Sequence, residues 1–153
     1  MGSVEIALEI LGVSLNVEYV KLAGVSSKFV SKGPLVGKVD DPPLGKGEWI
    51  GDDSGGDLFI TPEDGSLISR MAYPADLVRF VNSSVEAFIG TLEKFGTWVI
   101  GVEGLMGEGD SVEDVQPHLG ELRAAIDVVD PAALSGDENW WSVVVEQIAD
   151  GMI

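Results

Sequence analysis

The sequence predicts a single α+β domain in which an antiparallel β-meander is flanked by helices. Three observations lead to this fold class. The chain has 153 residues, the length of one ordinary domain. Short apolar runs between residues 48 and 71 are separated by tight turn signals, and such connections join antiparallel neighbours. The remaining apolar residues recur mostly with helical spacing.

The N-terminal part allows two interpretations. Residues 5–11 are either a short helix stopped by Gly12, since glycine favours the position after a helix end, or part of a strand. The strand is favoured by the partial alternation of Leu15, Val17 and Tyr19. The structure of residues 1–31 therefore stays open. Residues 32–47 are rich in Gly and Pro, which predicts a surface loop.

The meander is the clearest element. Strands are expected at 48–50, 57–61 and 66–71. Gly51 and Gly56 are expected to serve the first turn, and Pro and Gly at 62–65 suit the second.

A helix should follow the meander. Ser83 and Glu86 have the spacing of a capping box, and an apolar face follows at Val85, Phe88, Ile89, Leu92 and Phe95. We expect this helix to end near Gly96, with an acidic, Gly-rich loop at 101–115. Further helices are predicted at 117–126 and 138–150, the last with Trp141, Val144, Val145 and Ile148 inward, and a short helical turn is predicted at Asp130 and Pro131.

Charge is the most informative part of the composition. The chain has 26 Asp and Glu against 9 Lys and Arg, a net charge of −17. This excludes a nucleic-acid binder that works by neutralising phosphates and argues against anionic membrane surfaces. From Glu103 onward Arg123 is the single basic residue, so we expect the negative field to gather at one end. A basic protein partner suits this charge; plain solubility also accounts for it.

The sequence shows no cofactor site. Cys is absent, which excludes disulfides and thiolate ligands, and His118 is the single histidine and is expected at the surface. Asp52, Asp53 and Asp57 lack the spacing of a calcium loop, and local turn bonding explains them more simply. No apolar run approaches the ~18 residues of a membrane span, and no signal peptide begins the chain. We therefore expect a cytoplasmic protein.

The order of motifs resembles one family. The motif WIGDDSGGDLFI at 49–60, the PEDG turn at 62–65 and FVNSSVEAF at 80–88 resemble the SUKH superfamily of bacterial immunity proteins, most of all its fourth type. The tail is similar as well, with DPAAL at 130–134, Trp141, and IADG at 148–151. The resemblance covers about 48–92 and the last twenty residues.

This resemblance implies a SUKH-like α+β domain and the role of an antitoxin that binds a cognate polymorphic toxin without catalysis. We take the matched Gly51, Gly56, Asn82 and Ser83 as fold determinants, the last two at the helix start. The resemblance does not locate the surface that binds the toxin.

The leading hypothesis is thus a monomeric immunity protein that occludes a basic toxin acting on nucleic acid or nucleotides. A cytoplasmic adaptor of the same fold is the alternative, and an acidic hydrolase with two carboxylates is a third. Candidate contacts are Glu103, Glu108, Asp110, Glu113 and Asp114 in the acidic loop, followed by Asp52 and Asp53 in the first turn.

Overall fold

The computed structural model describes residues 2–33, 47–71, 77–105 and 116–151. Its centre is a five-stranded antiparallel sheet in the order β1-β2-β3-β4-β5. The strands are β1 (Ser14–Leu15), β2 (Glu48–Asp52), β3 (Gly56–Ile60), β4 (Leu67–Met71) and β5 (Val78–Asn82). The predicted α+β class with an antiparallel meander is confirmed. The predicted loop at 32–47 falls almost wholly outside the described residues.

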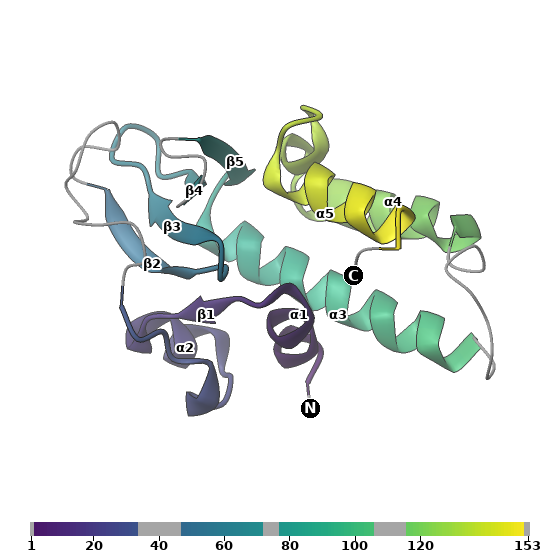
Figure 1. Ribbon diagram of the computed structural model, residues 1–153, viewed down its shortest axis with the longest axis horizontal. Helices are drawn as coiled ribbons and strands as arrows, with labels where there is room; N and C mark the ends of the chain where they lie inside the picture. Colours follow the sequence, from purple (N-terminus) through teal and green to yellow (C-terminus); the bar gives the residue numbers. More distant parts are fainter. Residues whose placement is uncertain (1, 34–46, 72–76, 106–115, 152–153) are drawn as a thin grey trace.

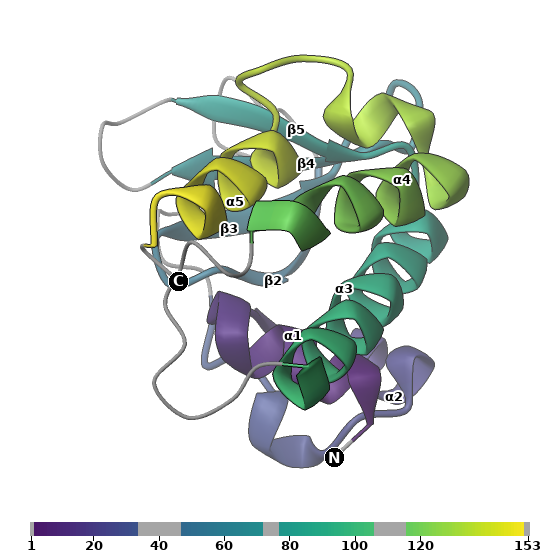
Figure 2. The same ribbon diagram turned by 90° about the vertical axis from the view of Figure 1, so that its right-hand side faces the viewer.

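Five α-helices accompany the sheet in the described part of the chain. They are α1 (Ser3–Leu11), α2 (Val17–Ala23), α3 (Val85–Leu105), α4 (Leu119–Val129) and α5 (Trp140–Ala149), with short 3₁₀ turns at Ser27–Phe29, Gln116–His118 and Pro131–Leu134. Figures 1 and 2 show α3, α4 and α5 on one side of the sheet, with α1 beside α3 and α2 next to β1. The fold is therefore a sheet with one helix-covered face.

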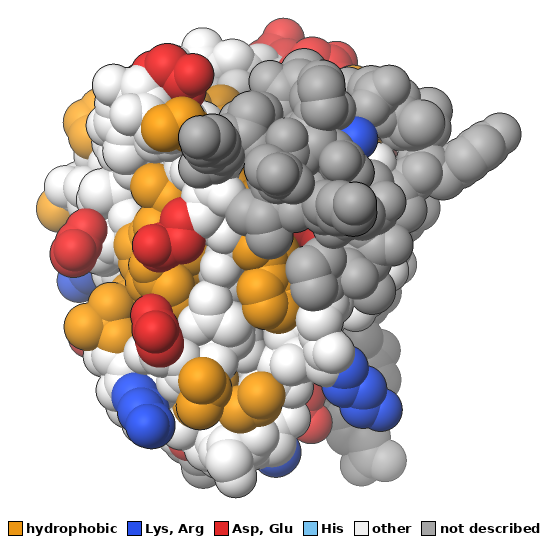
Figure 3. Space-filling view, turned by 90° about the vertical axis from the view of Figure 1, so that its left-hand side faces the viewer, with side chains coloured by type: hydrophobic (Ala, Val, Ile, Leu, Met, Phe, Trp, Pro, Cys, Tyr) orange, Lys and Arg blue, Asp and Glu red, His pale blue; other side chains and the backbone are white. Residues whose placement is uncertain are grey.

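The other face of the sheet carries a row of apolar side chains. Trp49, Phe59, Ile68 and Phe80 pair across β2, β3, β4 and β5 in register. Figure 3 shows this side of the molecule, where hydrophobic side chains lie among Asp and Glu.

The open question at the N-terminus is resolved in favour of the helix. Residues 5–11 belong to α1, which ends at Gly12 with φ 68°, a left-handed conformation that glycine adopts without strain. The apparent alternation after it spans two elements, because Leu15 lies in β1 and Val17 begins α2. Asn16 separates them, and its side-chain oxygen accepts hydrogen bonds from the backbone N–H groups of Glu18 and Tyr19.

Gly51 and Gly56 are strand residues, so the expectation that they serve the turn is wrong. A Cβ added at Gly51 would lie 2.1 Å from the Ser14 carbonyl oxygen, and one at Gly56 would lie 2.3 Å from the Arg70 carbonyl oxygen. Both positions need glycine because neighbouring backbone comes too close for any side chain. The turn itself lies at Ser54, which has φ 70° and whose hydroxyl donates to the Gly12 carbonyl at 2.8 Å.

Helix α3 begins at Val85, within two residues of Ser83 as predicted, but its cap differs from the expected one. The hydroxyl of Ser84, rather than that of Ser83, accepts from the Ala87 N–H at 3.0 Å. The hydroxyl of Ser83 donates instead to Asp130 at 2.8 Å. The predicted capping box of Ser83 and Glu86 is therefore wrong, because a long-range partner takes its hydroxyl.

Helix α3 also does not end near Gly96; it is 21 residues long and ends at Leu105. A Cβ added at Gly96 would lie 1.8 Å from the Ser3 carbonyl oxygen, so this glycine lets α1 and α3 touch at the backbone. The expected acidic loop at 101–115 is consequently helical over its first five residues, and 106–115 lie outside the described residues.

The core lies between the sheet and α3, α4 and α5. Phe88 and Leu92 are fully buried, as is Trp141. The rings of Phe88 and Trp140 meet edge-on with centroids 6.1 Å apart, and those of Trp140 and Trp141 are 4.9 Å apart. The inward face predicted for the last helix is confirmed, and Trp140 joins it, so neither Trp is an exposed platform.

Candidate partner-binding groove

The structure describes three of the seven predicted contact residues. Glu103, Asp52 and Asp53 lie in described segments, whereas the other four, Glu108, Asp110, Glu113 and Asp114, lie outside them. The three described carboxylates have different surroundings, and only two of them face a cavity.

Asp52 is nearly buried and forms hydrogen bonds within the fold. It is 9% exposed. Its Oδ2 accepts from the Ser31 hydroxyl at 2.5 Å, and its Oδ1 accepts from the Ser54 N–H at 3.2 Å. Because two separate segments supply these donors, Asp52 ties the end of β2 to the chain before residue 34.

Asp53 is half-buried and points into a cavity. Its Oδ1 accepts from the Gly55 N–H at 3.0 Å, and its Oδ2 accepts from the Trp140 indole N–H at 2.8 Å and the Ser69 hydroxyl at 3.4 Å. These three donors are uncharged, so they fix the carboxylate without neutralising it. The indole bond also anchors the first turn to α5.

Asp53 lines a cavity of about 340 Å³ between the end of α1, the sheet and α5. Ile10 and Leu11 of α1 face Val143, Val144 and Gln147 of α5 across it. Apolar side chains form much of its lining, and Asp53, Ser69 and Arg79 are polar residues on the sheet side.

A second cavity of about 270 Å³ lies between α1, α3 and α5. Trp98, Val102 and Glu103 of α3 line it, together with Ile148 of α5. Ile10 lines both cavities, so the two flank this residue. We call the pair the α1–α5 groove. It brings Asp53 and Glu103, which are far apart in sequence, to one surface feature.

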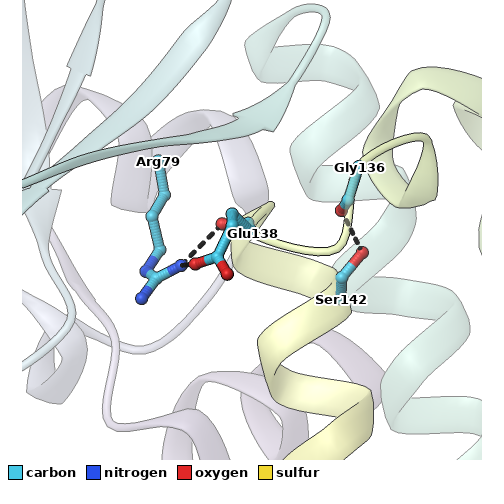
Figure 4. Close-up of polar contacts among 4 residues, drawn as sticks. All are labelled: Arg79, Gly136, Glu138 and Ser142. Atoms are coloured by element: carbon cyan, nitrogen blue, oxygen red, sulfur yellow. Dashed lines mark hydrogen bonds and ion pairs between the residues drawn. The ribbon is translucent and has the colours of Figure 1, made fainter.

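The cation in the wall of the first cavity is Arg79 from β5. Figure 4 shows its guanidinium directed at Glu138, just before α5. The Nη1 atom donates to the Glu138 carbonyl at 2.7 Å and to its carboxylate at 2.9 Å. Beside it, the Ser142 hydroxyl donates to the Gly136 carbonyl at 2.8 Å and closes the turn that leads into α5. Arg79 therefore already has an anionic partner, while Asp53 is bonded to neutral groups.

Behind the groove lies a buried polar network that was not predicted from the sequence. Asp130, 4% exposed, accepts from the Asn82 amide at 2.9 Å, the Ser83 N–H at 2.8 Å and the Ser83 hydroxyl at 2.8 Å. The Trp141 indole donates to the Asn82 carbonyl oxygen at 2.8 Å, and the Asn82 amide also reaches the Thr91 hydroxyl at 3.2 Å. Asn82 and Ser83 thus join the start of α3 to the segment before α5.

The pKa of Asp130 reflects this network. Burial by itself raises the pKa of this carboxyl, but hydrogen bonds from Ser83 and Asn82 outweigh it and hold the pKa below its usual value. Hydrogen bonds likewise lower the pKa of two exposed carboxyls, that of Glu5 through the Ser26 N–H and that of Asp64 to about 2 through Thr61 and Ser66. These shifts all stabilise charged carboxylates, the opposite of what a general acid needs, and give the hydrolase alternative no support.

The described segments show neither an assembled metal site nor a membrane-spanning helix. Asp57, one of the three aspartates considered for calcium, is fully buried and accepts from the Trp49 indole at 3.3 Å. Within those segments no group of three or more acidic or His side chains is placed to hold a metal ion. The His118 imidazole lies 3.7 Å from the Glu121 carboxylate and is partly exposed. None of the described helices has the length and apolar character to cross a bilayer.

The structure is thus an acidic α+β domain with a groove between α1, α3 and α5 and buried carboxylates that hold its segments together. Comparison with family models gives a match to the SUKH-4 immunity protein over residues 37–147, well over half of the chain. The chain therefore belongs to the SUKH-4 immunity protein family. Comparisons with curated proteins and with solved structures gave no match.

Proposed function

We propose that the protein binds and neutralises a cognate polymorphic toxin, and that this toxin is basic and acts on nucleic acid or nucleotides. The family match over residues 37–147 carries the immunity role. The net charge of −17 supports a basic partner, because a toxin that attacks nucleic acid needs a positive substrate cleft.

The charges of the described residues are unevenly distributed. The end of the molecule with α4 and α5 exposes the carboxylates of Glu121, Asp127, Asp137, Glu138, Glu146 and Asp150 against the single exposed Arg123. In contrast, Lys21, Lys28 and Lys32 lie near α2, at the other end of the molecule. Such an asymmetric field favours encounter with a basic partner in one orientation.

In this proposal, the protein neutralises the toxin by covering its substrate cleft. A negative surface seated over the substrate cleft of the toxin excludes the anionic substrate, so neither catalysis nor a cofactor is required. The protein acts as a cytoplasmic monomer, one copy for each toxin molecule.

Co-expression tests this role. A candidate cognate toxin is expressed in a sensitive host with and without the chain, and growth is followed. Rescue of growth together with a purified complex is the expected result. An unrelated acidic protein of similar size and charge is the control. Absence of both rescue and complex would favour the adaptor alternative.

A further inference from the structure

The α1–α5 groove has the shape of a protein contact rather than of a small-molecule site. Its cavities of about 340 and 270 Å³ lie at or below the lower end of the range of roughly 300–1,000 Å³ for ligand pockets. They flank Ile10, which is 37% exposed on α1. Two small cavities with apolar residues in their walls, one on either side of an exposed aliphatic residue, suit side chains presented by another protein.

The charges around the groove favour a cationic side chain of a binding partner. Asp53 accepts hydrogen bonds from uncharged donors in one cavity, and the exposed Glu103 lines the other. Glu9 precedes Ile10 on α1 and is exposed. Arg79, which lines the first cavity, forms an ion pair with the Glu138 carboxylate at 2.9 Å. A Lys or Arg entering beside an apolar anchor therefore meets a carboxylate in each cavity, Asp53 in the first and Glu103 in the second.

We propose that this groove receives one segment of the cognate toxin, in which an apolar side chain is adjacent to Lys or Arg. The apolar side chain packs against Ile10 and the α5 face of Val143, and the cation approaches Asp53 or Glu103. The inference rests on the immunity function proposed above and adds the docking surface and the chemistry of the bound segment.

The position of α1 in the chain gives this groove a role in specificity. Ile10 and Leu11 precede the residues that match the family, which begin at 37. One wall of the groove is therefore built by a segment outside the family pattern. An immunity protein that must select a single toxin needs contacts of this individual kind, because specificity is a difference between affinities.

The test compares Ile10→Arg with a matched control. Val78, also β-branched, is 38% exposed, nearly the same as Ile10. It lies on the opposite face of the sheet, since its strand neighbour Arg79 faces the groove. Val78→Arg therefore makes a comparable change of size and charge away from the groove. Gln147→Lys in the wall of the first cavity is a second groove variant in case Ile10→Arg disturbs α1.

Binding to the purified domain of the candidate toxin is measured by calorimetry, after circular dichroism has shown that each variant is folded. We expect Ile10→Arg to weaken binding by about 30-fold or more, as loss of a central anchor does. Gln147→Lys should weaken binding in the same direction. Val78→Arg should change it by less than about threefold. Asp53→Asn should weaken binding and flatten its dependence on salt.

The outcomes separate the two proposals. If the unmodified chain binds the toxin and the folded groove variants bind equally well, the groove is not the docking surface while the immunity role stands. A selective loss with Val78→Arg would move the interface to the opposite face of the sheet. If the unmodified chain neither binds nor protects, both proposals fall.

Discussion

Replacing Asp130 by Ala and by Asn separates the two contributions that this side chain makes to stability. The carboxylate accepts three hydrogen bonds, from the Asn82 amide, the Ser83 N–H and the Ser83 hydroxyl. Ala removes every acceptor. Asn keeps an oxygen for the Asn82 and Ser83 N–H donors if its amide nitrogen turns toward the Ser83 hydroxyl, which can accept as well as donate.

The magnitudes follow from which donors lose their partner. With Ala, the Ser83 N–H and the second donor of the Asn82 amide are left unpaired in a mostly buried site, and each such loss costs roughly 1–3 kcal/mol. We therefore expect Asp130→Ala to lower the free energy of unfolding by about 3–5 kcal/mol. Asp130→Asn retains the pattern of bonds but loses the charge, which makes them weaker, so about 1–2 kcal/mol is expected.

The pH dependence distinguishes the variants further. The pKa of Asp130 is lowered in the folded protein, so its contribution is complete above the unfolded value of about 3.9 and is lost as the pH falls through the folded pKa. Asn does not titrate. The difference in stability between the unmodified protein and Asp130→Asn should thus be constant from pH 7 to about 5 and narrow below about 4.

Urea unfolding followed by Trp fluorescence at several pH values measures these quantities. The buried Trp141, one of four Trp residues in the chain, donates to Asn82 in the same network, so its environment changes when this site unfolds. The control is Asp127→Asn, an exposed carboxylate on α4, which should change stability by less than about 0.5 kcal/mol. A loss below ~1 kcal/mol for Asp130→Ala would refute the reasoning that the network is buried and cooperative.

Three further predictions concern packing and association. Phe88→Ala should lower the free energy of unfolding by about 3–5 kcal/mol, because the ring is fully buried against Trp140 and Trp141, and a loss under ~1 kcal/mol in urea would contradict that packing. Gly96→Ala should destabilise by about 1–3 kcal/mol, although Ala favours helices, because its Cβ meets the α1 backbone; a gain in melting temperature would show that the helices do not touch there. Lys at Glu108, Asp110 and Glu113 together should slow association with the toxin and flatten its salt dependence in stopped-flow experiments, and an unchanged rate at low salt would exclude this segment from steering.

The part of the fold that could be predicted from sequence is the part with local signals. The strands between 48 and 71 are joined by short turns whose residues lie beside the strands they connect. In contrast, β1 has only two residues and pairs with β2 across more than thirty residues of chain. β5 was not predicted as a strand, because its pairing with β4 includes a register shift and its sequence leads directly into the helix start.

Helix boundaries were misjudged where distant backbone decides them. An interior glycine disfavours a helix by about 1 kcal/mol, which made Gly96 a reasonable end on local grounds. The contact with the α1 backbone outweighs that preference, since only glycine lets the two helices approach so closely. Likewise, Ser83 has the local spacing of a cap, but Asp130, far along the chain, takes its hydroxyl.

Prediction of the candidate site likewise required knowledge of contacts between residues far apart in the chain. Residue type and charge were enough to single out Asp53 and Glu103, but they could not separate Asp53 from Asp52, its neighbour. That difference arises from the alternation of the strand end, which turns Asp52 toward Ser31 and Asp53 toward Trp140. The groove itself needed Ile10, whose segment the sequence left undecided between helix and strand.

The buried network lies directly behind the groove and fixes the position of two of its walls. Asn82, Ser83, Asp130 and Trp141 lie within residues 37–147, and their bonds fix the start of α3 against α5. Because α3 and α5 are fixed relative to each other, a third element can complete a groove between them. The residues of that third wall can then vary while the other two walls keep their positions. α1 is that element, and it precedes the matched region while packing against α3 at Gly96. In the docking mode proposed above, variation at the exposed Ile10 would therefore change what the groove accepts without disturbing the network that fixes α3 against α5.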